Sequence, residues 1–387
     1  MKPLSPVDAI GPAFSRMRTI LLPPGALPGQ PAQFRFWFFL RIVVVAGLTN
    51  PSLIYGFCIM AMEGVFFGLA GLGAGLRGLH GQHTGFAPSG FAGLMVGFFA
   101  VAALIALAVW LLLTWLWSRL RFTLFDLVVY EHGRVGLAWS RYSRPAWRFL
   151  GLVILVSLAF LLLASVTIGP MFLHLIVLMR GMTPQQINSD PFLMMSHIFP
   201  IYGMIFAMAI LAGLVGAVMT DFLLPPMAIE DAPLESAFAR FFRLLGSRFW
   251  TVALYLLLRF VLQLGLGWVG GMVVMIVLFI AGGGGVAGGF VLYRSLWHLG
   301  GGAAAIFILY CVVAGLALIA FYLLTMMVLY GLVMVFIQSY AAYFFGSHYP
   351  ELGDRLEPGA PTPVPFAGPP APAAPIAPPI PELPPIW

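Results

Sequence analysis

Glu63 and Arg259 are the two ionisable side chains that lie deepest within long apolar stretches of the sequence. A charge at the centre of a bilayer costs about 2.5–3.5 kcal/mol on insertion scales, and pairing with an opposite charge offsets much of that cost. We therefore predict that both side chains face the interior of a helical bundle and lie near each other. Such a pair serves as a relay for a proton or a substrate, or as a buried structural contact, unless the two residues reach separate interfaces. One pair is little for a transport pathway, which favours the structural interpretation.

Other chemically suggestive residues carry weaker signals. Residues 283–288 match G-x-G-x-x-G, but they follow an apolar span without a strand–helix–strand context, which predicts a flexible turn. His80 and His83 are spaced for a surface metal contact without a third ligand, and His174 and His197 flank one predicted loop. The sequence contains no nucleophile elbow, zinc-protease or Walker motif. We therefore predict no enzymatic activity and no catalytic, cofactor or metal site.

The composition places these residues in a membrane. Of the 387 residues, 61% are hydrophobic and 8% are charged, whereas an average soluble chain is about 25% charged. The net charge of +6 is therefore interpreted through membrane topology and not as a signal for nucleic-acid binding. Cys58 and Cys311 both lie in apolar stretches and form no disulfide framework. The class that fits is an all-α integral membrane protein.

A bundle of about six transmembrane helices is predicted, because one span takes about 20 apolar residues. The helical domain covers 34–350, between an N-terminal arm at 1–33, expected to be loosely ordered with a short helix around 12–22, and a proline-rich tail at 351–387. Whether 36–76 makes one or two membrane segments stays open. The predicted spans are about 52–76, 91–117, 149–178, 198–220, 249–281 and 303–330, with interfacial helices at about 36–49, 132–146, 232–247 and 336–345.

Two stretches that precede spans form an internal repeat. Residues 131–144 and 230–243 share a glutamate, an aliphatic residue four positions later, an Ala–aromatic pair and two arginines three apart. Their apolar residues recur at steps of three and four, which predicts amphipathic elbow helices at the membrane surface. These helices either bind headgroups or partners, or only orient the next span. The second alternative is favoured, because arginines at span boundaries are already expected from the positive-inside rule. The candidate contacts are Arg141, Arg144, Arg148, Arg240, Arg243 and Arg248.

The distribution of basic residues predicts the orientation. Six spans place both termini on one side, and most of the 19 Lys and Arg residues fall on that side. Arg77, Arg180 and Arg294 fall on the opposite side, and Arg259 falls within a span. The positive-inside rule then predicts cytoplasmic termini, in a bacterial inner membrane.

The segment 225–243, with the span that follows it, and the segment 338–352 resemble a broad set of uncharacterised bacterial membrane proteins. They are similar to the membrane domain found beside some glycerophosphodiester phosphodiesterases. The resemblance covers about 120–350 through degenerate motifs. It implies an all-helical module without catalytic residues in the membrane part, and no soluble phosphodiesterase domain is evident in this sequence.

The proline-rich tail predicts extended polyproline II structure, either as a spacer or as a docking segment for a protein partner. Its candidate docking residues are Pro375, Pro378, Pro381, Pro384 and Trp387. Taken with the elbows, this favours a non-enzymatic scaffold or accessory subunit of a membrane complex, in contact with anionic lipid headgroups. The alternative is a small-solute or lipid transporter that uses Glu63 and Arg259.

Overall fold

The computed structural model describes residues 3–22, 35–50, 88–131, 135–181, 191–296 and 301–357. Every regular element in these ranges is a helix, and they contain no strand. In chain order the elements are α1 (Ile10–Leu21), α2 (Phe36–Leu48), α4 (Pro88–Tyr130), α5 (Val135–Arg141), α6 (Ser143–Thr167), α7 (Gly169–Gly181), α9 (Pro191–Val218), the π-helix η1 (Met219–Leu223), α10 (Leu224–Glu230), α11 (Leu234–Ser247), α12 (Phe249–Leu296), α13 (Gly301–Gly346) and α14 (Pro350–Leu356). The predicted all-α class is confirmed for this part of the chain.

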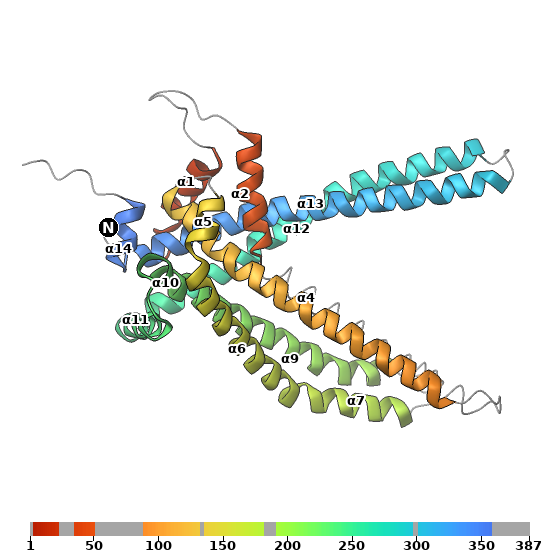
Figure 1. Cartoon of the computed structure of the whole chain (residues 1–387), viewed down its shortest axis with the longest axis horizontal. Helices are drawn as coiled ribbons and strands as arrows, with labels where there is room; N and C mark the ends of the chain where they lie inside the picture. Colours follow the sequence, from red (N-terminus) through yellow and green to blue (C-terminus); the bar gives the residue numbers. More distant parts are fainter. Residues whose placement is uncertain are drawn as a thin grey trace, which may run out of the picture.

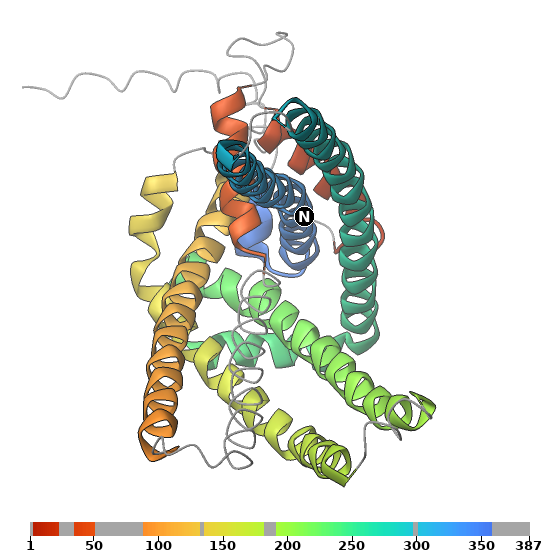
Figure 2. The same ribbon diagram turned by 90° about the vertical axis from the view of Figure 1, so that its right-hand side faces the viewer.

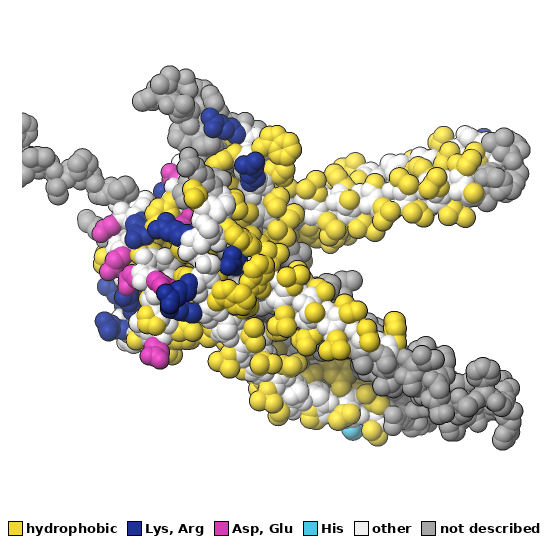
Figure 3. All heavy atoms as spheres, viewed as in Figure 1, with side chains coloured by type: hydrophobic (Ala, Val, Ile, Leu, Met, Phe, Trp, Pro, Cys, Tyr) yellow, Lys and Arg dark blue, Asp and Glu magenta, His cyan; other side chains and the backbone are white. Residues whose placement is uncertain are grey.

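One end of the molecule, here called the head, gathers the short helices α1, α5, α10, α11 and α14 around the adjoining ends of the long ones (Figure 1). Two groups of helices leave the head. The hairpin arm consists of α12 and α13, and the three-helix arm consists of α4, α9 and the successive helices α6 and α7. The arms diverge in both views (Figures 1 and 2). On the face shown in Figure 3, charged side chains gather on the head and apolar side chains cover the arms.

Five helical stretches are long and apolar enough to cross a membrane. They are Leu104–Tyr130, Ser143–Leu178, Met195–Glu230, Phe249–Leu296 and Ala305–Gly346. They overlap five of the six predicted spans, and the remaining prediction, 52–76, lies outside the described residues. The long apolar stretches of the sequence are therefore helices of membrane-spanning length.

Several of these helices continue beyond the predicted spans. α4 runs on to Tyr130, and α9 continues through η1 and α10 to Glu230, although the predicted span ends at residue 220. Two prolines, Pro225 and Pro226, lie at the start of α10, directly after the π-helical turn of η1. The expected separate interfacial helix at 336–345 is wrong, because α13 runs unbroken to Gly346 and its last turns are buried in the head. These helices are therefore longer than a membrane crossing requires, and their additional turns pack in the head.

The flexible turn expected at 283–288 is also wrong, because these residues lie within α12. Tyr310 of α13 packs against this part of α12, and its O–H donates to the Gly285 carbonyl at 2.8 Å. A Cβ at Gly288 would lie 2.7 Å from the Tyr310 hydroxyl oxygen. The glycines thus admit a large side chain from the neighbouring helix, and this contact and the continuous backbone hydrogen bonds offset their weak helix propensity.

The two elbows differ in length. α11 matches the predicted helix at 232–247, whereas the predicted helix at 132–146 is broken at Tyr142, between α5 and α6. The helix before each elbow is followed directly by an acidic residue of left-handed conformation, Glu131 with φ 52° and Asp231 with φ 50°. The apolar face of α11, which includes Phe241, packs on the protein core. The internal repeat itself stays a prediction.

The N-terminal arm is packed onto the head, so the expectation of a loosely ordered arm is wrong for residues 3–22. Arg16 of α1 donates from Nε to the Val128 carbonyl at 3.0 Å and from Nη2 to the Val129 carbonyl at 2.6 Å. These carbonyls belong to the last turn of α4, where no further helical N–H is available to them. The Tyr340 hydroxyl donates to the Pro6 carbonyl at 3.0 Å and holds the arm against α13.

An aromatic core joins the helices in the head. The ring of Tyr255 on α12 stacks between two rings of α13, with its centroid 4.2 Å from that of Phe344 and 5.2 Å from that of Tyr340. Phe222 of η1 meets Phe344 and Phe241 edge-on or tilted. Because rings of this size dominate the area that a core buries, the head is where the arms are fixed to each other.

Candidate functional site

A buried polar cluster lies where the two arms join. It consists of Asp221 in η1 with Tyr255 and Arg259 on α12, which are 2%, 0% and 6% exposed. The Asp221 carboxylate forms an ion pair with Arg259 Nε and accepts from Arg259 Nη2 at 3.3 Å. It also accepts from the Tyr255 hydroxyl at 2.7 Å and from Thr220 Oγ1 at 2.9 Å. Both carboxylate oxygens are therefore satisfied.

Local helix geometry positions this cluster. The wider turn of η1 is a kind of irregularity that recurs at functional sites, and here it holds Asp221 in the head core. Tyr255 and Arg259 are four residues apart on α12, so they share one helical face. Breaking a buried ion pair by removing one partner costs about 3–5 kcal/mol. The cluster therefore acts first as a clamp between α12 and the helices of the other arm.

The predicted partner of Arg259 was Glu63, which lies outside the described residues. Arg259 is buried as predicted, and the carboxylate beside it belongs to Asp221. Sequence reasoning missed this partner because the predicted span ends at residue 220, one position before Asp221. The available signal was that Asp221 is itself an isolated acid at the edge of a long apolar stretch.

A second buried carboxylate, Asp126 of α4, repeats part of this arrangement. It is 1% exposed and accepts from the Tyr142 hydroxyl at 2.5 Å. Arg141 Nη1 lies 3.8 Å from its Oδ1, and the Arg141 guanidinium lies over the ring of Tyr130. Burial, followed by the hydrogen bond to Asp126, raises the pKa of Tyr142, so this phenol stays protonated. The contact ties the first elbow to α4.

A third cluster joins the second elbow to the C-terminal end of the described chain. Arg240 of α11 donates through both Nη atoms to the Glu230 carboxylate at 2.6 Å. Tyr349 donates its hydroxyl to Glu230 and accepts from Arg240 Nη1 at 3.0 Å. Burial and the hydrogen bond to Glu230 raise the pKa of Tyr349, and the Glu230 hydrogen bonds raise that of Arg240. A fork-to-fork pair of this kind fixes orientation as well as charge.

The six arginines predicted to contact headgroups divide into two groups. Four of them already bind protein groups: Arg141 contacts Asp126, Arg148 contacts Asp231 at 3.2 Å, Arg240 contacts Glu230, and Arg248 contacts His348 at 3.1 Å. Arg144 and Arg243 are exposed, and in the described part of the chain neither has an ion pair. These two remain the predicted headgroup contacts with a free charge.

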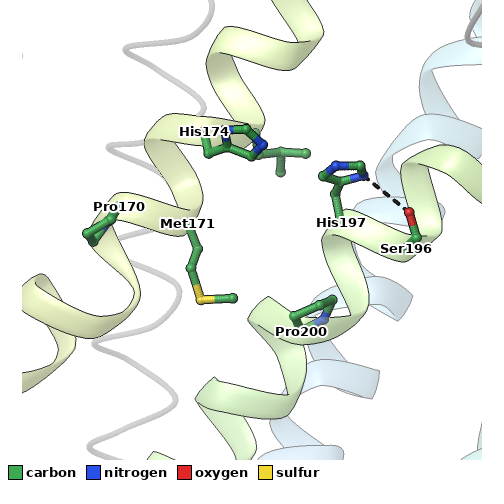
Figure 4. Close-up of a pocket in the computed structure, with 7 residues that line it drawn as sticks. Pro170, Met171, His174, Ser196, His197 and Pro200 are labelled. Carbon is green, nitrogen blue, oxygen red and sulfur yellow. Dashed lines mark hydrogen bonds between the residues drawn. The ribbon is translucent and has the colours of Figure 1, made fainter.

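The histidines His174 and His197 meet at the other end of the three-helix arm. Their ring centroids lie 5.9 Å apart beside a cavity of about 350 Å³ between α7 and α9 (Figure 4). Met171 and Pro200 also line the cavity, and Ser196 Oγ lies 3.2 Å from His197 Nδ1. Among the described residues, no three His, Cys, Asp or Glu side chains gather as metal ligands. The tail residues 375–387 and His80 and His83 lie outside the described ranges.

The chain belongs to the DUF7544 family, a family of unknown function, whose model matches residues 4–355. No curated protein and no solved structure matches the chain. The family match does not bear on the resemblance to the membrane domain of glycerophosphodiester phosphodiesterases, which stays a hypothesis.

Proposed function

We propose that this DUF7544 protein is a non-enzymatic scaffold or accessory subunit of a bacterial inner-membrane complex, with both termini in the cytoplasm. The observation that carries the proposal is that the fold has two distinct parts, a packed polar and aromatic head and two separate apolar arms. An ion-paired and aromatic head fixes two arms, and the arms diverge as apolar helices whose described residues include many exposed large side chains (Figures 1 and 3).

The arms have the surface that partner helices need. Leu104 on α4, Phe279 on α12 and Leu309 on α13 are 66%, 84% and 63% exposed. Lipid alone can cover such residues, but apolar helices packed in a single bundle would cover part of each other. Separated arms fit a subunit that completes its packing with transmembrane helices of other proteins.

The predicted topology is supported by the position of the described ends. The first and last described helices, α1 and α14, both lie in the head, together with the elbow helices α5 and α11 (Figure 1). The Thr49 carbonyl accepts from the Trp117 indole N–H at 2.8 Å, so the end of α2 lies near the head. The next described helix, α4, begins at the far end of its arm (Figure 1). With the span predicted from the sequence at 52–76, the six spans place both ends on the basic side.

Photo-crosslinking in native membranes tests the scaffold proposal. Photoreactive side chains placed at Leu104 and Leu309 should each form a crosslink to one defined membrane protein that co-purifies stoichiometrically in mild detergent. The same group at Arg243, which lies in the head, serves as the control for capture unrelated to the arms. Crosslinks to lipid alone at both arm positions, from a protein that purifies without a partner, would refute the proposal. A variant lacking residues 358–387 tests whether the tail recruits the partner.

The transporter alternative predicts a different result. A transporter should lose uptake or lipid transfer in Glu63→Gln while the variant remains folded and inserted, whereas a scaffold should tolerate this change. The Asp221 carboxylate favours the scaffold, because it already gives Arg259 an opposite charge among the described residues. A membrane module beside a soluble enzyme, as the glycerophosphodiester phosphodiesterase resemblance implies, is one form that the scaffold role takes.

A further inference from the structure

Arg119 is the first charge on α4 after a long stretch without any. The residues from Pro88 to Ser118 contain no charged side chain, so Arg119 marks the point where this helix reaches the head. Its guanidinium carbon lies 5.3 Å from the ring centroid of Trp115 and 5.2 Å from that of Trp139 on α5. A third indole, that of Trp147 on α6, lies 6.5 Å from the Trp115 ring and is 58% exposed.

Arg119 lacks the carboxylate partner that several other arginines have. Its Nε is buried and has no acceptor among the described residues, which also place no carboxylate in an ion pair with it. Arg259, Arg240 and Arg148 each have a carboxylate instead. The two indole faces stabilise the positive charge, but they do not accept the in-plane N–H groups of a guanidinium. The guanidinium therefore still needs oxygen acceptors, and an anion such as a phosphate group supplies them together with an opposite charge.

The position of the cluster identifies the class of anion. Indole rings are enriched at the level of lipid headgroups, and α4 reaches this level after a charge-free length sufficient to cross the hydrocarbon core. The phosphate of a phospholipid lies at the same level. A guanidinium presents a planar fork of donors that binds phosphate oxygens in pairs.

We propose that Arg119, which lies against the rings of Trp115 and Trp139, binds the phosphate group of an anionic phospholipid at the edge of the head. Free phosphate offers the same chemistry, so the source of the phosphate is tested separately. This lipid site and the scaffold function proposed above have one assumption in common, that the arms lie in a membrane. A protein partner is neither required nor excluded by the lipid site.

Lipid-dependent thermal stabilisation of the purified full-length protein tests this site. Delipidated protein in a neutral detergent is titrated with phosphatidylglycerol, with phosphatidylcholine or with inorganic phosphate. Phosphatidylglycerol should raise the midpoint of unfolding of the wild type more than the other two probes. Arg119→Gln should weaken this response about tenfold or more, because it removes a charge-assisted pair of hydrogen bonds.

Matched variants separate the site from general attraction and from misfolding. Arg243→Gln removes the same charge from an exposed position and should keep the full response. Arg119→Lys should keep part of it, and Trp139→Leu should weaken it without changing the net charge. The midpoint of each variant without lipid shows whether it folds.

Equal responses of the wild type and folded Arg119→Gln would overturn the proposal, as would an equal loss in Arg243→Gln. A full response to inorganic phosphate would assign the site to free phosphate. Because this readout needs no partner, it is independent of the crosslinking result that decides the scaffold proposal.

Discussion

The crossing of α2 and α13 offers a prediction that the structure allows to be worked through. The two helices touch backbone to backbone at Gly47 and Gly331. A Cβ added at Gly47 would lie 2.4 Å from the Met327 carbonyl oxygen, and one at Gly331 would lie 2.2 Å from the Val43 carbonyl oxygen. Carbon–oxygen contacts between close helices are normally about 3.3–3.6 Å, so a methyl group requires the helices to separate by about 1 Å.

Separation is costly because the crossing is well packed. Val43 and Ala46 of α2 are both 0% exposed, and a shift of the helix would open gaps beside them. Overpacking in a close-packed core costs about 1–3 kcal/mol, and fixed backbone atoms on both sides place each glycine at the upper end of that range. We expect Gly47→Ala and Gly331→Ala each to lower the free energy of unfolding by about 2–3 kcal/mol. The double variant should cost less than the sum, because the first methyl already separates the helices.

The assay is the midpoint of thermal unfolding in one detergent, with Gly315→Ala as the control on the same helix. A Cβ at Gly315 meets no atom within 4 Å, so alanine there should be neutral or stabilising by up to about 1 kcal/mol through helix propensity. Midpoints of Gly47→Ala and Gly331→Ala equal to that of Gly315→Ala would show that the close crossing is not the source of stability.

Three further predictions concern the polar clusters. Arg259→Met should lower the free energy of unfolding by about 3–5 kcal/mol, and adding Asp221→Asn should restore part of it; an unchanged midpoint in the single variant would contradict a buried pair. Tyr349→Phe should cost about 1–2 kcal/mol in the same assay, because it leaves two charged partners without the hydroxyl, and a cost below the error of the assay would show that water replaces it. Burial and the nearby Arg248 lower the pKa of His348 in the folded state. As the pH falls, this imidazole therefore takes up a proton in the unfolded chain at a higher pH than in the folded chain. Stability should therefore be full above pH about 6.5 and fall as the pH drops towards the lower pKa of the folded state, a dependence that His348→Gln should reduce.

The contacts of His348 in the head require one tautomer of its imidazole ring, with the proton on Nδ1. Its Nδ1 lies 3.0 Å from the Phe344 carbonyl, which requires an N–H at that position, and its Nε2 then accepts from Arg248 Nη1 at 3.1 Å. A second proton on Nε2 would remove this hydrogen bond and bring two positive charges together. The end of α13 and the end of α11 are thus linked by a contact that acid weakens.

The candidate site was only half visible in the sequence. Arg259 stood out because a charge within a long apolar stretch must be compensated, and its burial agrees with that reasoning. The identity of the compensating acid depends on how α12 packs against η1, and no spacing rule connects residues 38 positions apart. Similarly, the basic residues of the elbows were evident, but their acidic partners Asp231 and Glu230 are decided by the way the helices turn.

By itself, the sequence determined the class of protein, the approximate location of five long apolar helices and the helical elbow at 234–247. These features follow from composition and from local periodicity, which act within one helix at a time. Only the tertiary structure decided where the helices end, how α2 crosses α13 at Gly47 and Gly331, and which carboxylate faces Arg259. Those features depend on contacts between segments far apart in the chain. The physical reason is that a helix propagates through hydrogen bonds four residues apart, whereas its end and its polar partners are set by whatever surface it packs against.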